Sequence, residues 1–344
     1  MKMLKIFYLV CLMALSSSNI FSQVFKSNVS KKGTTAAPFL SIGQGARALS
    51  MGGAYVAVAD DPSSIYWNPA GIADINGGSF MVDHTLWLAD VQYNYIVGTL
   101  PIGEYGTIGM SFTSSSIDEM QVTTTDKPEG NGETFSISDI AFSVAYAVKL
   151  TDKFTIGFNP KYVYQKIWKM SASAMAIDIG VKYVTPFDDA VLGMSISNFG
   201  SKMQMLGTSS SVLFDPDQST TGNNGKIPAT LTTGEWGLPL NFKVGIAYKI
   251  YSDESNKLLL AIDASHPSDN YESIDLGGEY TFNDFIFLRG GFKSLFLVDS
   301  EEGMTFGVGV KQAVVGNYRF AFDYAYQNFG ILKSTQKFSV GFLF

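Results

Sequence analysis

Residues 138–148, SDIAFSVAYAV, alternate between large apolar side chains and small or polar ones. A period of two is typical of a β-strand whose two faces meet different surroundings. The same alternation recurs at 91–100, 175–183, 240–250 and 318–326. A soluble β-sandwich also alternates, so a single segment decides little. The repetition favours an all-β fold, a transmembrane antiparallel β-barrel with its large apolar side chains toward lipid and its small or charged ones toward the lumen.

The two faces differ in the same way in most of these segments. In 138–148, Ile140, Phe142, Val144 and Tyr146 oppose Ala, Ser and Asp side chains. In 91–100, Tyr93, Tyr95, Val97 and Thr99 share one face. By the same rule, the large apolar face of each segment is expected to point toward lipid.

The pattern predicts about fourteen strands, separated by turns. They cover 79–88, 91–100, 105–125, 135–149, 154–168, 172–184, 190–204, 238–250, 257–266, 271–281, 284–294, 304–312, 316–328 and 334–344. If both ends of the barrel domain lie in the periplasm, the connections after even-numbered strands must be the short periplasmic turns. They are short in every case, and the longest connection, 205–237, follows the seventh strand and is expected outside the cell.

Composition agrees with this class of protein. The 344 residues are 46% apolar, 14% aromatic and only 16% charged, with 34 glycines. No apolar run approaches the ~20 residues of a membrane-spanning helix. The formal net charge of −7 and the lack of a basic cluster argue against nucleic acid as a partner.

The first 22 residues read as a secretory signal peptide. Lys2 and Lys5 form its positive start, residues 6–15 its apolar centre and residues 16–22 its small polar end. Cleavage after Ser22 removes Cys11, the one cysteine, so the exported chain cannot be stabilised by disulfides. No lipobox precedes Cys11, and lipidation is therefore not expected.

Residues 43–71, GQGARALSMGGAYVAVADDPSSIYWNPAG, differ in kind from the strands. Gly43 to Ala48 spells G-x-G-x-x-A, which imitates a dinucleotide-binding loop, but that loop requires a βαβ unit. The glycines more simply permit tight turns and close backbone contact. Residues 23–77 are therefore predicted to form a small hatch of short helices and loops that plugs the barrel of residues 78–344. A periplasmic cap is the alternative.

Within this hatch, a structural motif is predicted at seven positions. Asp60, Asp61 and Pro62 suit a turn or a helix start, because Asp caps free amides and Pro fits the first helical turn. Asn68-Pro69 is another turn signal. The motif residues are Asp60, Asp61, Pro62, Asn68, Pro69, Ala70 and Gly71.

No catalytic or metal site is predicted. The two histidines, His84 and His266, lie in separate strands, and no Cys–His pair or serine triad can be assembled. No enzyme activity, cofactor or resident metal is expected. In the long loop, Asp215, Asp217 and Ser219, together with Asn223 and Asn224, offer oxygen atoms that could bind calcium or stay solvated.

The C-terminus carries a further signal. Phe338, Val340, Phe342 and the terminal Phe344 share one face of the last strand. This ending resembles the recognition signal of the barrel-assembly machinery, although a terminal strand of a soluble sheet would alternate as well. Together with the signal peptide, it predicts the outer membrane of a Gram-negative bacterium, and hence outer-membrane lipid and the barrel-assembly machinery as partners.

The run GARALSMGGAYVAVADDPSSIYWNPAG, residues 45–71, resembles the N-terminal signature of the PorV/PorQ family, a branch of the FadL/TodX-type outer-membrane barrels. Leu100-Pro101-Ile102-Gly103-Glu104-Tyr105-Gly106 and the strands up to the terminal Phe fit the same family. The resemblance implies a fourteen-stranded barrel with an N-terminal hatch that contains Asn68, Pro69, Ala70 and Gly71.

The resemblance implies two different functions. Some PorV and PorQ members serve type IX protein secretion, binding secreted cargo or joining its surface-attachment complex. FadL-type members instead pass hydrophobic small molecules, such as long-chain fatty acids, through a lateral opening. The first function implies secreted proteins or type IX secretion subunits as partners, and the second implies a hydrophobic ligand.

Overall fold

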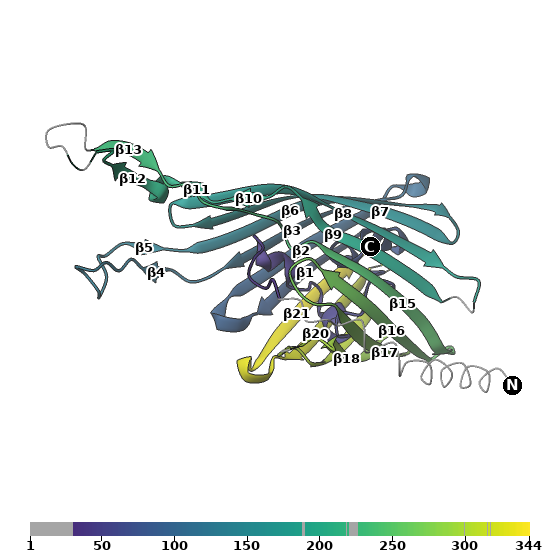
Figure 1. Cartoon of the computed structure of the whole chain (residues 1–344). Helices are drawn as coiled ribbons and strands as arrows, with labels where there is room; N and C mark the ends of the chain where they lie inside the picture. The colour runs from purple at the N-terminus through teal and green to yellow at the C-terminus, as the bar shows by residue number, and fades with distance from the viewer. Residues whose placement is uncertain are drawn as a thin grey trace, which may run out of the picture. The chain divides into compact units, whose positions relative to one another are not determined.

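The alternating segments fold into a closed barrel. The computed structural model describes residues 30–187, 190–217, 219, 226–298, 300–314, 316 and 318–344, of which 32–344 form one compact unit. The predicted signal peptide, residues 1–22, lies outside the described residues. In the described part, fourteen long antiparallel strands and the two-residue strand β11 (Leu206–Gly207) form one sheet. The predicted fourteen-stranded barrel is confirmed (Figure 1).

The wall strands follow one another in chain order around the barrel. They are β1 (Ser79–Leu86), β2 (Gln92–Pro101), β3 (Thr107–Ser116), β6 (Ile137–Thr151), β7 (Phe154–Ile167), β8 (Met170–Val184), β9 (Val191–Gly200), β15 (Asn241–Ser252), β16 (Asn256–Pro267), β17 (Ser273–Phe282), β18 (Ile286–Leu295), β19 (Met304–Ala313), β20 (Arg319–Asn328) and β21 (Ser334–Leu343). Closure comes from β1, which pairs with β21 from Ser79 opposite Leu343 to Leu86 opposite Gln336. No sheet edge is left along this seam, because both strands donate and accept backbone hydrogen bonds there.

Burial alternates along most of the wall strands as predicted, but in β2 the predicted direction of the two faces is wrong. In β6, Ala141, Ser143, Ala145 and Ala147 are buried, while Phe142, Val144 and Tyr146 are exposed on the outer surface. Burial alternates in β2 as well, but Tyr93, Tyr95 and Val97, which were expected to face lipid, are almost fully buried and face inward, and Ile96 and Leu100 face outward. The reason is local packing, since Tyr95 and Val97 share an apolar cluster with Ile65 and Ile72 of the N-terminal segment.

The two ends of the barrel carry different connections. The connections that follow β3 and β9 are long and extend beyond the wall (Figure 1). The first contains β4 (Met120–Gln121) and β5 (Thr134–Phe135). The second contains β10 (Met203–Gln204), β11, η6 (Thr208–Ser210), β12 (Ser211–Phe214), β13 (Ile227–Thr230) and β14 (Glu235–Trp236). Both leave the same end, the long-loop end, whereas tight turns such as Asp253–Ser255 close the other, the short-turn end.

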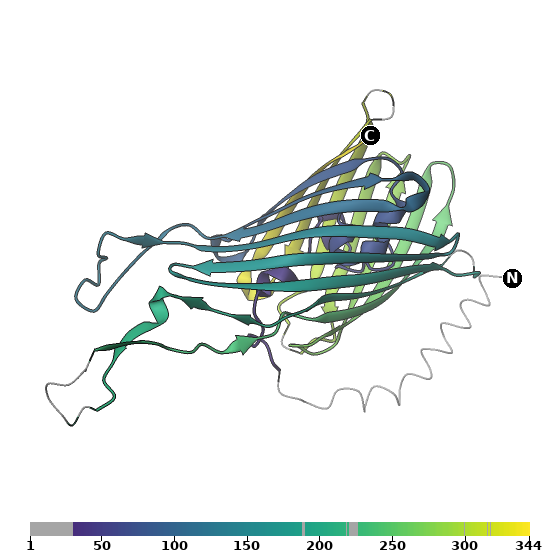
Figure 2. The ribbon, with the colours of Figure 1, turned by 90° about the horizontal axis from the view of Figure 1, so that it is seen from above.

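Short helices precede the barrel and lie inside it (Figure 2). We call residues 38–75 the inner segment; it contains η2 (Pro38–Ser41), α2 (Ala46–Ser50), α3 (Ser64–Trp67) and η3 (Pro69–Asp74). Further 3-10 turns lie between strands: η4 (Leu88–Asp90), η5 (Gly103–Tyr105) and η7 (Gly330–Leu332). No helix in the described ranges has the length and apolar character needed to cross a membrane.

Glycine and proline keep the helices of the inner segment short. Gly52 and Gly53 follow α2 with φ angles of 68° and 81°, a backbone region that favours glycine and ends the helix. Pro69 begins η3, a position at which a backbone N–H has no partner within the helix, so proline loses no hydrogen bond there. The side chain of Asn68 caps the same helix by accepting from the amide of Ala70 at 3.2 Å.

Candidate functional site

The inner segment is attached to the barrel wall through its backbone amides. Asp263 of β16 accepts from the amides of Tyr55 and Val56, both at 2.8 Å. Asp83 of β1 accepts from the amide of Gly45 at 2.5 Å. Charged acceptors make hydrogen bonds that are stronger than neutral ones, each contributing about 1.5–3 kcal/mol. These two carboxylates therefore hold two separate turns of the inner segment.

Asn68 links the inner segment to a second part of the wall. Its side-chain amide donates to the carbonyl of Val56 at 2.8 Å and to that of Val181 in β8 at 3.0 Å. Asn68 is fully buried, so both hydrogen bonds replace contacts with water that burial removes. Gly71 follows in the same helix, and a Cβ there would lie 2.3 Å from the carbonyl oxygen of Ala59. Only glycine fits this contact without a backbone shift.

The acidic pair of the predicted motif lies beside a half-buried arginine, Arg47. Arg47 contacts Asp60, and its Nε lies 2.7 Å from a carboxylate oxygen of Glu279 in β17. Asp61 accepts from the hydroxyl of Tyr55 at 2.6 Å. Burial lowers the pKa of Arg47, but the nearby Asp60 and Glu279 raise it by more than burial lowers it. The guanidinium therefore stays charged. A neighbouring arginine, Arg289, also pairs with Glu279 at 2.6 Å.

The inner segment touches the wall mainly where the wall has no side chain. Seven inward-facing glycines lie on seven strands, and a Cβ added at any of them would come within 2.0–2.6 Å of an atom of the inner segment. They are Gly109, Gly157, Gly180, Gly193, Gly277, Gly291 and Gly307. At Gly157, for example, the nearest atoms belong to the backbone of Pro69 and Ala70. Close backbone approach of this kind requires glycine.

A cavity of about 480 Å³ lies between the inner segment and the long-loop end; we call it the long-loop cavity. Tyr66 and Trp67 of the inner segment contribute to its lining. The wall contributes residues next to the long-loop ends of β9, β15, β16, β17 and β18, among them Ser197 and Ser265. The connection after β16 supplies Asp269 and Tyr271. The cavity is therefore enclosed by the inner segment, the barrel wall and this connection.

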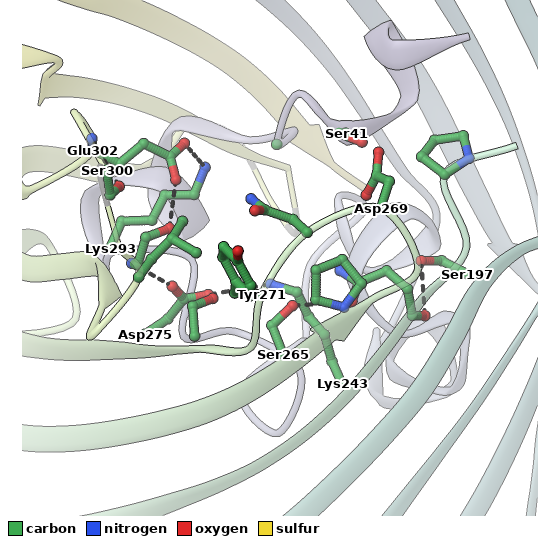
Figure 3. Close-up of a pocket in the computed structure, with 18 of the residues that line it drawn as sticks. Ser41, Ser197, Lys243, Ser265, Asp269, Tyr271, Asp275, Lys293, Ser300 and Glu302 are labelled. Carbon is green, nitrogen blue, oxygen red and sulfur yellow. Dashed lines mark hydrogen bonds and ion pairs between the residues drawn. The ribbon is translucent and has the colours of Figure 1, made fainter. Parts of the chain in front are cut away.

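Two ion pairs lie in the lining of the long-loop cavity. Lys243 lies 3.2 Å from Asp275 and 4.9 Å from the centre of the Trp67 ring. Lys293 lies 2.6 Å from Glu302, and burial raises the pKa of Glu302 while Lys293 lowers it more, leaving it below its ordinary value (Figure 3). The lining is thus polar, with three basic and four acidic side chains. It suits a hydrogen-bonding ligand better than an apolar one.

Two more cavities lie inside the barrel. One of about 650 Å³, the short-turn cavity, lies on the opposite side of the inner segment and is lined by Arg47, Asp60 and Pro62. The third holds only about 30 Å³ and is lined by residues such as Tyr95, Ser143 and Asn159. The inner segment therefore separates the two large cavities.

The predicted terminal signal lies on the outer face of the last strand. Phe338, Val340 and Phe342 alternate with the buried Lys337 and Ser339. The rings of Phe342 and Phe320 are 5.3 Å apart in an edge-to-face arrangement. The backbone amide of Phe344 donates to the carbonyl of Gly78 at 2.8 Å. Recognition of this face by the assembly machinery stays a prediction.

The oxygen-rich loop makes turns of its own. Asp215 accepts from the amide of Asp217 at 3.0 Å, and Asp217 accepts from the amide of Ser219 at 3.0 Å. Asn223 and Asn224 lie outside the described residues. Within the described ranges, no group of three or more His, Cys, Asp or Glu side chains is arranged to hold a metal ion.

Several residues that hold the inner segment were not predicted from the sequence. Asp83, Asp263, Glu279 and Lys182 were each visible as a charge on the small face of a strand. Lys182 donates to the carbonyl of Ala59 at 2.6 Å and pairs with Asp74 at 2.8 Å. Charge on a lumen face indicates a partner inside the barrel, since an unpaired buried charge is costly.

The sequence of the first half matches a known family. A family model described as "Type IX secretion system protein PorV" matches residues 25–206, more than half of the chain. The chain belongs to the PorV family. The match spans the inner segment and the wall from β1 to β9. No curated protein matches the sequence of this PorV-family chain.

Solved structures share the fold of this PorV-family barrel at low sequence identity. The toluene transporter TbuX of Ralstonia pickettii has 14% identity and a TM-score of 0.54, covering 87% of this chain and 97% of its own. The toluene transporter TodX of Pseudomonas putida has 12% identity and a TM-score of 0.52, covering 87% and 97%. Both support the barrel architecture, and identities this low carry no further conclusion.

Proposed function

We propose that this chain is a non-enzymatic outer-membrane barrel of a Gram-negative bacterium, acting as a component or cargo-binding partner of type IX-like protein secretion. The family match over residues 25–206 carries the proposal. In this role, residues 23–77 act as a hatch, with Asp60, Asp61, Pro62, Asn68, Pro69, Ala70 and Gly71 as structural residues. The long loops face the exterior, as expected when both ends of the barrel domain are periplasmic.

The long-loop cavity is the place we propose for a bound polypeptide segment. Its serine, asparagine and tyrosine side chains can form hydrogen bonds with peptide groups, and its cations Lys243 and Lys293 are already paired with carboxylates of the protein. Asn270 has a buried side-chain oxygen without a hydrogen-bond partner among the described residues. A peptide N–H would satisfy this acceptor. The inner segment closes the cavity on the side away from the long loops, so cargo would be held in the cavity and would not pass through the barrel.

A paired substitution tests this role of the cavity. In Ser273→Trp, a large ring projects into the cavity from the inward face of β17, whereas Ser173→Trp places the same ring on the outer face of β8. Tagged wild-type and Ser173→Trp proteins are expected to retain secreted proteins or secretion subunits on purification, and Ser273→Trp to lose the cargo. Heat-modifiable migration on a denaturing gel checks that both variants are folded barrels.

A clean deletion strain tests the wider proposal. Loss of secreted proteins from the medium, restored by the wild-type gene, is the expected result. A secretome unchanged by the deletion would contradict the role in secretion.

A passive channel for hydrophobic small molecules is the second candidate. One observation favours it: the pairing of β6 with β7 is interrupted between Ser143 opposite Lys161 and Tyr146 opposite Phe158, at the position of Pro160. Proline lacks the N–H that this pairing needs. The cavity behind the interruption is small and partly polar, which argues against apolar passage. Reduced uptake of fatty acid or toluene by the deletion strain, with an intact secretome, would favour the channel.

A further inference from the structure

The short-turn cavity has a distinct charge pattern. Its volume of about 650 Å³ lies within the range of small-molecule sites. Five basic side chains line it: Arg47, Lys257, Arg289, Lys311 and Arg319. Five acidic side chains line it too, so the cavity has no formal net charge. What distinguishes it is how these charges are paired.

Three of the five basic residues bind all of the acidic ones. Arg47 contacts Asp60 and Glu279 and lies 3.7 Å from Asp61. Arg289 binds Glu279 at 2.6 Å and Asp323 at 2.5 Å. Lys257 binds Asp284 at 2.6 Å. Each carboxylate of the cavity is therefore already neutralised by a cation in contact with it.

Lys311 and Arg319 have no such partner. Neither side chain makes an ion pair or hydrogen bond within the described part of the chain. They lie on neighbouring strands, β19 and β20, where Lys311 is opposite Ala321 and Arg319 is opposite Ala313. On one face of a sheet, such diagonal neighbours lie about 7–8 Å apart. The small Ala321 between them leaves the space in front of both cations open to the cavity.

Unpaired cations contrast with the other charges inside this barrel. Lys161, Lys182, Lys243 and Lys337 each lie within 4.0 Å of an aspartate, and Lys293 pairs with a glutamate. Pairing of this kind offsets the cost of placing a charge in a confined lumen. An anionic ligand would supply the same compensation at the half-buried Lys311, and Arg319, which is exposed at the short-turn end, is accessible to the same ligand.

We propose that Lys311 and Arg319 form a binding site for an oxyanion, a carboxylate or phosphate group carried by a small molecule that enters from the short-turn end. Arginine binds either group through two parallel N–H bonds, and the lysine ammonium adds a third donor. Met81 and Phe287 line the same cavity and provide apolar contact for the rest of such a ligand. The proposal concerns the end of the barrel opposite the proposed cargo site and does not depend on the function in secretion.

Titration calorimetry on the purified full-length mature protein in detergent tests the site, with inorganic phosphate and succinate as probes. Saturable binding of at least one probe is expected, and the tighter probe identifies the preferred oxyanion. Lys311→Gln and Arg319→Gln are each expected to weaken it by about tenfold or more, because a hydrogen bond to a charged group is lost.

Lys153→Gln is the matched control. Lys153 lies in the tight turn between β6 and β7 at the same end of the barrel, outside the cavity. Lys153→Gln removes one positive charge, as Lys311→Gln and Arg319→Gln do. Binding by this variant should equal that of the wild type. Failure of the wild type to bind either probe would overturn the proposal. Equal loss in Lys153→Gln and Lys311→Gln would also overturn it, since it would show attraction by overall charge alone. Heat-modifiability confirms that each variant is folded.

Discussion

Replacing Gly157 by alanine should weaken the contact of the inner segment with the wall without disrupting the strand pairing of the wall. The added Cβ would lie 2.4 Å from the carbonyl carbon of Pro69 and from the amide nitrogen of Ala70. Both are backbone atoms, so no side chain can rotate out of the way. Ordinary contact begins near 3.4 Å, and the difference of 3.4 − 2.4 requires η3 to retreat by about 1 Å.

Forcing extra volume into a packed interior costs about 1–3 kcal/mol. The cost falls on the contact between the inner segment and the wall, because β7 keeps its hydrogen bonds to β6 and β8. A change of about 1–3 kcal/mol corresponds to a roughly 5- to 150-fold larger population of the undocked segment. In the undocked state, the long-loop and short-turn cavities are expected to be connected.

Two assays measure this state. Conductance of the purified protein in a planar bilayer should rise, and limited proteolysis within residues 38–75 should become faster, while heat-modifiable migration is retained. Gly98→Ala is the control: Gly98 is a glycine of β2 whose added Cβ would meet nothing closer than 3.7 Å. If Gly157→Ala and Gly98→Ala behave alike in both assays, the close contact does not hold the inner segment.

Three further predictions concern single contacts. Asn68→Ala should speed proteolysis of the inner segment, because the carbonyls of Val56 and Val181 each lose a hydrogen-bond donor at a cost of about 1–3 kcal/mol; a rate equal to that of wild type would contradict it. Burial raises the pKa of Asp74, but Lys182 and Lys149 lower it more, so its ion pairs stabilise the fold above the ordinary carboxyl pKa and are lost as pH falls through the lowered value. The urea midpoint should therefore fall more between pH 6 and pH 3 in wild type than in Asp74→Asn, and parallel curves would argue against this pairing. Deletion of Phe344 should reduce the fraction of heat-modifiable barrel in membranes, whereas Phe344→Tyr should retain it; equal yields would remove the assembly signal from the terminal residue.

The strands were predictable because a membrane barrel repeats one physical rule along the chain. Lipid outside and a filled lumen inside favour a period of two along the wall strands, and burial follows it in the central part of β6 and along most of β8. β2 also alternates, but its large side chains Tyr95 and Val97 face inward because that side meets the apolar residues Ile65 and Ile72. The sequence of β2 contains no sign of that neighbour, which comes from a different part of the chain.

The attachment of the inner segment was not predictable in the same way. Asp263 binds amides more than 200 positions earlier, and that meeting depends on the stagger of the closed barrel. The inward glycines were a usable sign, since Gly157, Gly180 and Gly193 interrupt lumen faces otherwise filled by side chains. Such gaps predict that something packs there, but not which atoms.

The distribution of these attachments bears on what the barrel can do. Contacts to the inner segment come from β1 through Asp83, β8 through Lys182, β16 through Asp263 and β17 through Glu279, which lie around the whole circumference. Movement of the segment as one body would break all of them together, and each hydrogen bond to a charged group contributes about 1.5–3 kcal/mol. Passage through the lumen would therefore require a large input of energy or partial unfolding of the segment. Binding in the long-loop cavity requires neither, because that cavity is already formed above a closed floor. The geometry thus favours a barrel that holds its partner at one end over a barrel that conducts it from one side to the other.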